Sequence, residues 1–348
     1  MLLAKLSEVA GISGQEAEVR EAIRAEIAPY VDEITVDAIG NLVALKRGRG
    51  TGVSGGRRVM LAAHMDEVGL MVKGFESDGL LRVASAGGVD PRVLVSKMVY
   101  VGRGSEKHPG VIGSKPIHLL KREDMDRATD IKSLYVDIGA SSKEEASKLV
   151  QIGDPISFAT KCEPIGEGFI RGKAFDDRAG CCGVIEALKA QHDFDLYGAF
   201  TVQEEVGLRG AGVAAFRIKP DLALVLEGTT AHDIPKAPEH AFSTVPGKGP
   251  AIVHRDASWI GTRSVIDRLV ATAQAAGVPY QFKRSVTGGT DAGRIGLTEA
   301  GIPAAVMSVP CRFIHSPVSV MSISDFENYV KLAGLFLDSL DEGGLPLS

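Results

Sequence analysis

Residues 59–66 read Val-Met-Leu-Ala-Ala-His-Met-Asp, a continuous apolar run that is closed by a histidine and an aspartate. A short run that is apolar at every position predicts a strand buried on both faces, as in a parallel α/β sheet. Four further apolar runs end in polar residues of the same kinds, which are Asp176 and Asp177, Glu204 and Glu205, Glu227, and His315. A parallel α/β sheet has its ligand crevice at the carboxyl ends of its strands, so we expect these side chains to gather at one edge. Their number and type suit two divalent cations.

The composition is that of an ordinary globular protein. The chain has 348 residues, of which 45% are hydrophobic and 24% charged, and its net charge is -5. This length suggests about two domains. The charge and the lack of a basic stripe argue against nucleic acid or a membrane surface as partner. The sequence contains no run of about 18 apolar residues, so no membrane span is predicted. Residues 1–8 do not resemble a signal peptide, and we expect a cytoplasmic protein.

The cysteines do not predict a disulfide framework. The four lack C-x-x-C spacing, which favours buried thiols in a reducing compartment. An alternative is that Cys311, four residues before His315, ligates a metal.

Strand and helix patterns alternate at both ends of the chain, around a glycine-rich and mostly β segment. The alternation predicts a doubly wound α/β catalytic domain made of residues 1–67 and 166–348. Residues 68–165 are predicted to be an inserted β domain. Its expected strands cover residues 80–84, 98–102, 110–112, 134–138 and 155–159. One helix, over residues 141–150, begins with a capping-box pattern at Ser141 and Glu144. A G-x-G-x-x-G pattern at Gly50 precedes a strand, so it predicts a turn and not a dinucleotide site.

His64 and Asp66 lie on the same side of an extended segment, because side chains alternate along a strand. A histidine that binds metal usually donates its second N–H to an acceptor, a role that Asp66 can fill unless it is itself a ligand. The alternative for such a pair is an ordinary surface contact.

Asp176 and Asp177 are adjacent carboxylates that repel each other unless a cation compensates them. One carboxylate can bridge two cations about 3.5–4 Å apart. The alternative, that Asp177 caps the helix beginning at Arg178, is compatible with Asp176 as the bridge.

Glu204 and Glu205 point in different directions, so one can ligate a metal while the other takes a proton from water. The alternative is the solvated start of a helix. Glu227, after a buried strand, is costly to bury unpaired. A single histidine such as His315 is more often a core or surface residue, so the hypothesis depends on the coincidence of all five signals.

Taken together, these residues resemble the M42 family of di-metal aminopeptidases, which includes the glutamyl and tetrahedral aminopeptidases. The resemblance covers nearly the whole chain. The matching stretches are residues 63–69, 173–178, 202–207, 288–293 and 312–317, with residues 112–120 in the insertion.

The resemblance implies a zinc-peptidase-like sheet and a PDZ-like β-barrel that mediates dimerisation. It also implies one metal on His64, Asp176 and Glu227, and a second on Asp176, Glu205 and His315. Zinc or cobalt is expected, with manganese as a further candidate.

By the same resemblance, Glu204 is the general base that activates a metal-bound hydroxide, and Asp66 orients His64. The expected substrate is a peptide with a free N-terminus, and the expected assembly is a dimer or a tetrahedral dodecamer. A cis peptide between Asp176 and Asp177 is expected too. The chain departs from the family at Glu227, where many relatives have aspartate.

Other hypotheses remain open at this point. A related di-metal carboxypeptidase, dipeptidase or N-deacylase would need a site for a substrate carboxylate, which Lys283, Arg284 or Arg294 could supply. A metal-independent glycosidase and a non-catalytic assembly protein are the remaining alternatives.

Overall fold

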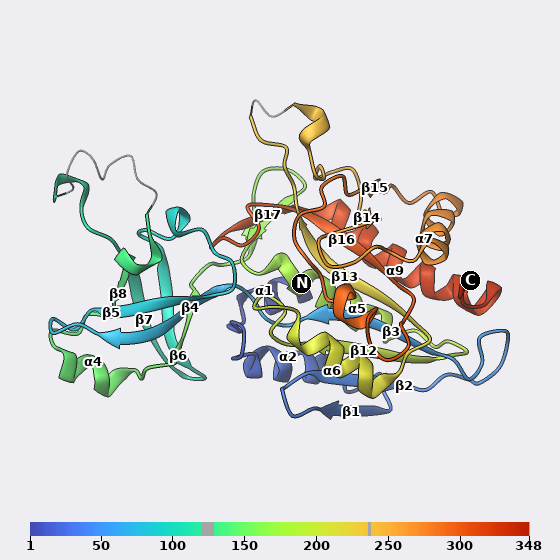
Figure 1. The fold of residues 1–348 in the computed structure, drawn as a ribbon, viewed down its shortest axis with the longest axis horizontal. Coiled ribbons are helices and arrows are strands. Elements are labelled where there is room, and N and C mark those ends of the chain that lie inside the picture. Colours follow the sequence, from blue (N-terminus) through green and yellow to red (C-terminus); the bar gives the residue numbers. More distant parts are fainter. Residues whose placement is uncertain (120–128, 236–237, 348) are drawn as a thin grey trace.

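The fold consists of a large mixed sheet covered by helices and a separate small barrel (Figure 1). The computed structural model describes residues 1–119, 129–235 and 238–347. Leu120, the last residue of one matching stretch, lies outside them. Among the described helices, none has both the length and the apolar composition that a bilayer crossing requires.

The large sheet has the strand order β1-β2-β12-β3-β13-β16-β17-β11-β10, and β14 and β15 extend it beside β16. The central strands β12, β3, β13 and β16 are parallel. Their carboxyl ends therefore meet at one edge, as the sequence predicts. The strands are Glu33–Val36 (β1), Leu42–Lys46 (β2), Arg58–His64 (β3), Glu163–Pro164 (β10), Phe169–Gly172 (β11), Asp195–Thr201 (β12), Leu222–Thr230 (β13), Ala251–Val253 (β14), Gln281–Phe282 (β15), Ala304–Arg312 (β16) and Ser319–Ser322 (β17).

Helices cover both faces of this sheet. Along β3, Leu61 and Ala63 pack against one group of helices, while Met60 and Ala62 pack against the other. This alternation explains why the run is apolar at every position. The first group is Leu2–Glu8 (α1), Ala17–Ile27 (α2), Phe175–Ala187 (α5), Arg263–Ala275 (α7) and Ile323–Gly343 (α9), and the second is Arg209–Ile218 (α6) and Ala292–Ile295 (α8).

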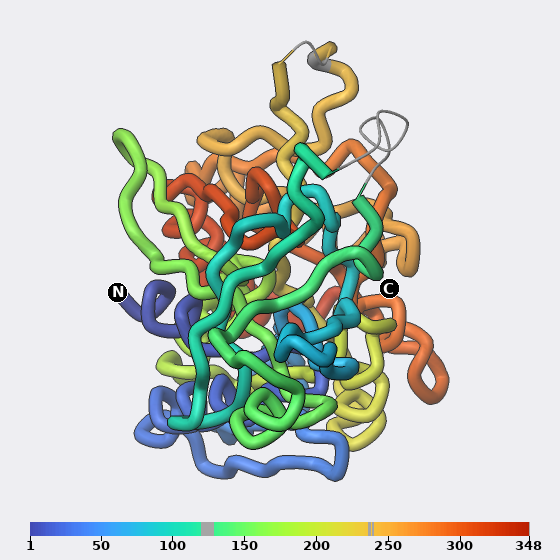
Figure 2. The backbone as a smooth tube through the Cα atoms, turned by 90° about the vertical axis from the view of Figure 1, so that its left-hand side faces the viewer, coloured from blue at the N-terminus to red at the C-terminus, as the bar shows by residue number. Residues whose placement is uncertain are grey.

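The barrel is closed and entirely antiparallel, with the strand order β4-β5-β8-β7-β6-β9. It lies beside the α/β sheet in Figure 1 and faces the viewer in Figure 2. Its own core contains Leu70, Val99 and Ile156. Its elements are Gly69–Phe75 (β4), Leu81–Ala86 (β5), Met98–Arg103 (β6), Glu106–Gly113 (β7), Tyr135–Asp137 (β8), Lys143–Leu149 (α4) and Pro155–Phe158 (β9). The expected α/β domain with an inserted β-barrel is confirmed.

The division of the chain at residues 67/68 and 165/166 stays a prediction. The barrel strands begin at Gly69 and end at Phe158, whereas β10 at Glu163–Pro164 already pairs with β11 of the large sheet.

The capping residue of α4 differs from the expected one. Ser142, not Ser141, is the N-cap, and its Oγ accepts a hydrogen bond from the Glu145 N–H at 3.2 Å. Glu145 in turn accepts from the N–H and the hydroxyl of Ser141, at 2.8 and 2.6 Å. The motif is therefore displaced by one residue, because two serines and two glutamates stand side by side.

Two of the predicted strand ends are also different. Glu227 lies within β13 and not after it, since the ladder with β16 continues as far as Thr230. β11 ends at Gly172, so Asp176 is placed by the start of α5.

Candidate metal centre

The five predicted ligands come from different elements and converge at the carboxyl edge of the sheet. His64 is the last residue of β3, Glu205 follows β12, and Glu227 lies in β13. Asp176 lies at the start of α5, and His315 lies in the turn between β16 and β17.

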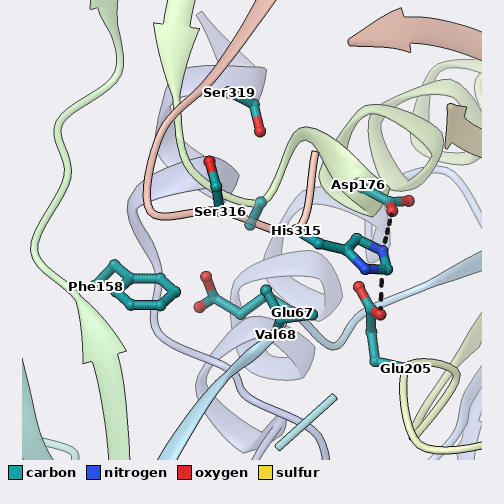
Figure 3. A pocket seen from close by; sticks show the side chains of 9 residues that line it. Glu67, Val68, Phe158, Asp176, Glu205, His315, Ser316 and Ser319 are labelled. Atoms are coloured by element: carbon teal, nitrogen blue, oxygen red, sulfur yellow. Dashed lines mark hydrogen bonds and ion pairs between the residues drawn. The ribbon is translucent and has the colours of Figure 1, made fainter. Parts of the chain in front are cut away.

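Asp176 lies between the two histidines, with one carboxylate oxygen near each. Its Oδ1 is 3.3 Å from Nε2 of His64, and its Oδ2 is 3.2 Å from Nε2 of His315. Glu227 is 3.6 Å from His64, and Glu205 is 3.3 Å from His315. Figure 3 shows His315 pointing between Asp176 and Glu205. Each histidine therefore has Asp176 and one glutamate beside it. The groups of three whose ligand atoms all lie within 4.8 Å of one another are His64 with Asp176 and Glu205, and His64 with Asp177 and Glu227. One carboxylate close to two histidines is compatible with a bridged pair of cations.

Unsatisfied buried oxygens support cation binding. Asp176 Oδ1 and Glu227 Oε1 are buried and accept no hydrogen bond. A buried carboxylate oxygen without a donor is costly, and a divalent cation with O and N ligands would compensate it. The residues present therefore fit the metal ions.

The pKa values of the carboxylates and of His315 in the absence of a cation also support metal binding. Burial raises the pKa of Glu204 and Glu227 well above the ordinary value, and burial together with Asp176 raises that of Glu205 to about 7. Burial lowers the pKa of His315, but Asp176 and Glu205 outweigh this effect and raise it to about 9. The metal-free site therefore holds protons that metal ions would displace.

Asp177 has a structural role in addition to its place near the metal centre. It lies with His64 and Glu227 in a group whose ligand atoms are all within 4.8 Å of one another. Both of its oxygens, however, accept backbone N–H groups, from Gly180 at 2.8 Å and from His64 at 3.2 Å. The bond from Gly180 is the predicted helix-capping contact. The peptide between Asp176 and Asp177 is cis, as predicted.

Asp66 is bonded mainly to the segment that carries the two glutamates. Its carboxylate accepts the N–H of Glu204 at 3.0 Å, the N–H of Glu205 at 3.2 Å and the hydroxyl of Ser13 at 2.6 Å. His64 Nδ1 is 3.5 Å from that carboxylate but 3.0 Å from the backbone carbonyl of Asp66. The contact from Ser13 was not predicted, because no local pattern marks this residue.

A second buried ionic group lies beside the metal ligands and was also not predicted. Lys173 donates to both oxygens of Glu67, at 2.7 and 2.8 Å, and to the carbonyl of Val9 at 3.0 Å. Arg178 donates to the carbonyls of Leu6 and Met65, at 2.5 and 2.9 Å. These contacts fix the N-terminal segment against the residues next to His64 and Asp176.

Backbone geometry also distinguishes the loops at the site. Ala174, Gln203, Leu208, Phe313 and His315 all have φ values between 53° and 59°, a region that residues with side chains rarely adopt. Such conformations gather at functional sites because the surrounding structure must impose them. Among these five only His315 is of a residue type enriched in this region, so the residue types do not indicate the conformation of the other four.

All four cysteines are free thiols. Among the described residues, no cysteine belongs to a group of side chains that could hold a metal ion. Cys311 Sγ instead contacts the Val309 carbonyl at 3.7 Å. Burial raises the pKa of the Cys311 thiol well above its ordinary value.

A cavity of about 690 Å³ opens onto the centre. Asp176, Glu204, Glu205 and Glu227 line one part of it. Residues 287–290 and Lys283 line another part. A peptide terminus can therefore reach the carboxylates from solvent. An α/β sheet with such a site defines a metal-dependent hydrolase.

Comparison with known proteins identifies the family. Residues 40–332 match the family described as M42 glutamyl aminopeptidase. A putative aminopeptidase of Acetivibrio thermocellus is 42% identical over 95% of this chain and 96% of its own length. A lysyl aminopeptidase of Pyrococcus furiosus is 34% identical over 97% of this chain and 96% of its own. The chain belongs to the M42 glutamyl aminopeptidase family, and it is a metallo-aminopeptidase.

Solved structures agree with this assignment. The TET aminopeptidase of Thaumarchaeota archaeon SCGC AB-539-E09 matches with a TM-score of 0.92 and 36% identity, over 99% of this chain and 98% of the other. The Pyrococcus horikoshii TET1 peptidase, which can assemble into a tetrahedron or a large octahedral shell, matches with a TM-score of 0.85 and 34% identity, over 96% and 98% of the two chains.

Proposed function

We propose that this aminopeptidase binds two divalent cations that share Asp176. His64 and Glu227 would complete one site, and Glu205 and His315 the other. The observation that carries the proposal is the placement of the two Asp176 oxygens, one toward each histidine. Zinc and cobalt are the expected metals, and manganese also suits these N and O ligands.

The remaining glutamate, Glu204, is the proposed general base. It is 9% exposed and lines the cavity, and its Oε2 is 4.0 Å from His64 Nε2. When bound, the metal ions would lower the pKa of water and polarise the substrate carbonyl. Glu204 would accept the proton of the attacking water and return it to the leaving amine as the C–N bond breaks. Asp66 would hold the Glu204–Glu205 segment through its two backbone contacts.

A panel of aminoacyl-anilides with added zinc, cobalt or manganese tests the activity. We expect hydrolysis that stops on chelation and returns with metal, and none of an N-acetylated control. Anilide hydrolysis that resists chelation would contradict the proposal, whereas chelator-resistant hydrolysis of a glycoside would favour the glycosidase alternative. Elemental analysis should find about two cations per chain after metal saturation. Asp176→Asn should weaken the binding of both, because it replaces one of the two oxygens with an NH2 group that cannot ligate a cation.

We further propose that the protein works in the cytoplasm as a homo-oligomer, a dimer through the barrel or a dodecamer. Structural relatives assemble as dodecameric TET peptidases. In this chain the barrel leaves Met98, Tyr100 and Val111 exposed, at 63%, 44% and 45%. Such apolar residues on adjacent strands are typical of an interaction surface. A light-scattering mass near 36.7 kDa, that of one chain, would rule this out.

A further inference from the structure

The backbone of the segment that carries the two glutamates is held by side chains. β12 ends at Thr201, and beyond it four successive N–H groups, those of residues 202–205, donate to side-chain oxygens. The acceptors come from three segments that precede the barrel, between 138 and 187 positions away in the chain. They are Asn41 for Val202 at 3.0 Å, Glu16 for Gln203 at 3.2 Å, and Asp66 for Glu204 and Glu205 at 3.0 and 3.2 Å.

Glu16 is a buried carboxylate whose bonds serve this segment. It is 4% exposed, and no lysine or arginine in the described part of the chain pairs with it. It is the N-cap residue of α2, but its side chain makes no capping bond to that helix. Its Oε1 instead accepts the N–H of Gly14 at 2.6 Å and that of Gln203. Burying a carboxylate is costly, so packing alone would be served better by an apolar residue.

The conformation of Gln203 explains what the contact with Glu16 achieves. Gln203 has a φ of 58°, a left-handed conformation that is unfavourable for a residue with a Cβ atom. It directly precedes Glu204, so its backbone angles set the direction in which the Glu204 side chain leaves the chain. The bond from the Gln203 N–H to Glu16 stabilises this conformation, and the bond from Gly14 fixes the accepting oxygen.

We propose that Glu16 is a positioning residue for the general base. By accepting the N–H of Gln203, it holds the turn that directs the Glu204 carboxylate into the cavity over the metal centre. Glu16 acts through the backbone and does not line that cavity. The inference rests on the proposed function, in which Glu204 accepts the proton of the attacking water. Asp66 holds the same segment at the next two N–H groups, so two buried carboxylates share the task.

The test measures kcat, KM and metal content of the metal-loaded protein with the anilide that the wild type cleaves fastest. Glu16→Met removes the acceptor, and kcat should fall by about 10- to 100-fold, because misplacing a catalytic group by roughly 1 Å can cost about 10²-fold. KM and metal content should change little. Glu16→Gln should retain most of kcat, since its amide oxygen can accept both N–H groups. Glu16→Asp keeps the charge but is one methylene shorter, so its kcat should fall. Glu18→Met is the matched control in the first turn of α2, where Glu18 binds Lys107 and the Gly104 N–H of the barrel, and it should keep the wild-type kcat.

A double-mutant cycle shows whether Glu16 acts through Glu204. If it does, Glu16→Met should have little further effect on kcat in protein that already carries Glu204→Gln. Equal losses in the two backgrounds would overturn the inference, as would loss of metal in Glu16→Met or a wild-type kcat in Glu16→Met or Glu16→Asp. A defect in Glu18→Met as large as that in Glu16→Met would show a general effect on α2 and would also overturn it. A wild-type kcat in Glu204→Gln would instead overturn the general-base assignment itself. If the melting temperature shows that Glu16→Met does not fold, the difference in kcat between Glu16→Gln and Glu16→Asp decides, and equal values would overturn the inference.

Discussion

The contacts of Asp66 predict a specific defect in the variant Asp66→Asn. In the protein, one oxygen accepts the N–H of Glu204, and the other accepts the N–H of Glu205 and the hydroxyl of Ser13. An asparagine has an NH2 group in place of one oxygen. This group is a hydrogen-bond donor, so it cannot accept the backbone N–H that the oxygen accepted, and at least one of the two backbone contacts is lost. A hydrogen bond to a charged group contributes about 1.5–3 kcal/mol, which corresponds to roughly a 10- to 150-fold change. We therefore expect kcat to fall by about 10- to 100-fold as Glu204 loses its position.

The metal should be retained in that variant, because His64 Nδ1 lies closer to the backbone carbonyl of Asp66 than to its carboxylate. Steady-state kinetics with glutamyl-anilide and parallel elemental analysis give the two measurements. Ser13→Ala is the matched control, since it removes one donor and leaves both backbone contacts, and its defect should be smaller. Loss of a cation in Asp66→Asn would show that Asp66 acts on His64. An unchanged kcat with intact metal content would refute the positioning role altogether.

Three further predictions concern the metal ligands and the ionic group beside them. Glu204→Gln should keep its metal and lose roughly 10²–10⁴-fold in kcat, whereas Glu205→Gln should weaken metal binding. Elemental analysis and kinetics measure the two effects. The opposite result would exchange the roles of general base and metal ligand between the two glutamates. Metal affinity, measured by calorimetric titration, should be weaker at pH 6 than at pH 8. The Glu205 pKa of about 7 leaves a proton on this ligand below pH 7, and the metal must displace that proton. Equal affinities at the two pH values would contradict this prediction. Lys173→Met should lower the free energy of unfolding in urea by about 3–5 kcal/mol, since it leaves the Glu67 carboxylate buried without its main partner, while the exposed Lys248→Met should change little.

The parts of the molecule that follow from short-range patterns were predictable from the sequence. The apolar runs of β3, β12, β13 and β16 identify central strands, because a strand buried on both faces must be apolar at successive positions. The convergence of His64, Glu205 and His315 followed from the rule for carboxyl ends of parallel strands, whereas Asp176 is placed by the start of α5 and Glu227 lies within β13.

The parts that depend on pairing between distant segments were not predictable. The length of β13 is set by its ladder with β16, which continues beyond the apolar run to Thr230. Ser13 reaches Asp66 from 53 positions away, and Lys173 reaches Glu67 from 106 positions away. β14 and β15 are three and two residues long, and pairing with neighbours defines them more than composition does.

The position of the barrel in the chain has a consequence for synthesis on the ribosome. β3 is one of the central strands of the sheet, yet its two neighbours, β12 and β13, begin only at Asp195 and Leu222. The barrel strands pair only with one another, within residues 69–158, so the barrel can form once this segment has emerged, whereas the apolar β3 must wait for both partners. During that interval the nascent chain exposes a strand that the native state buries on both faces, and such strands are prone to aggregate. The slow step in making this enzyme should therefore be the closure of its central sheet around an already folded insertion.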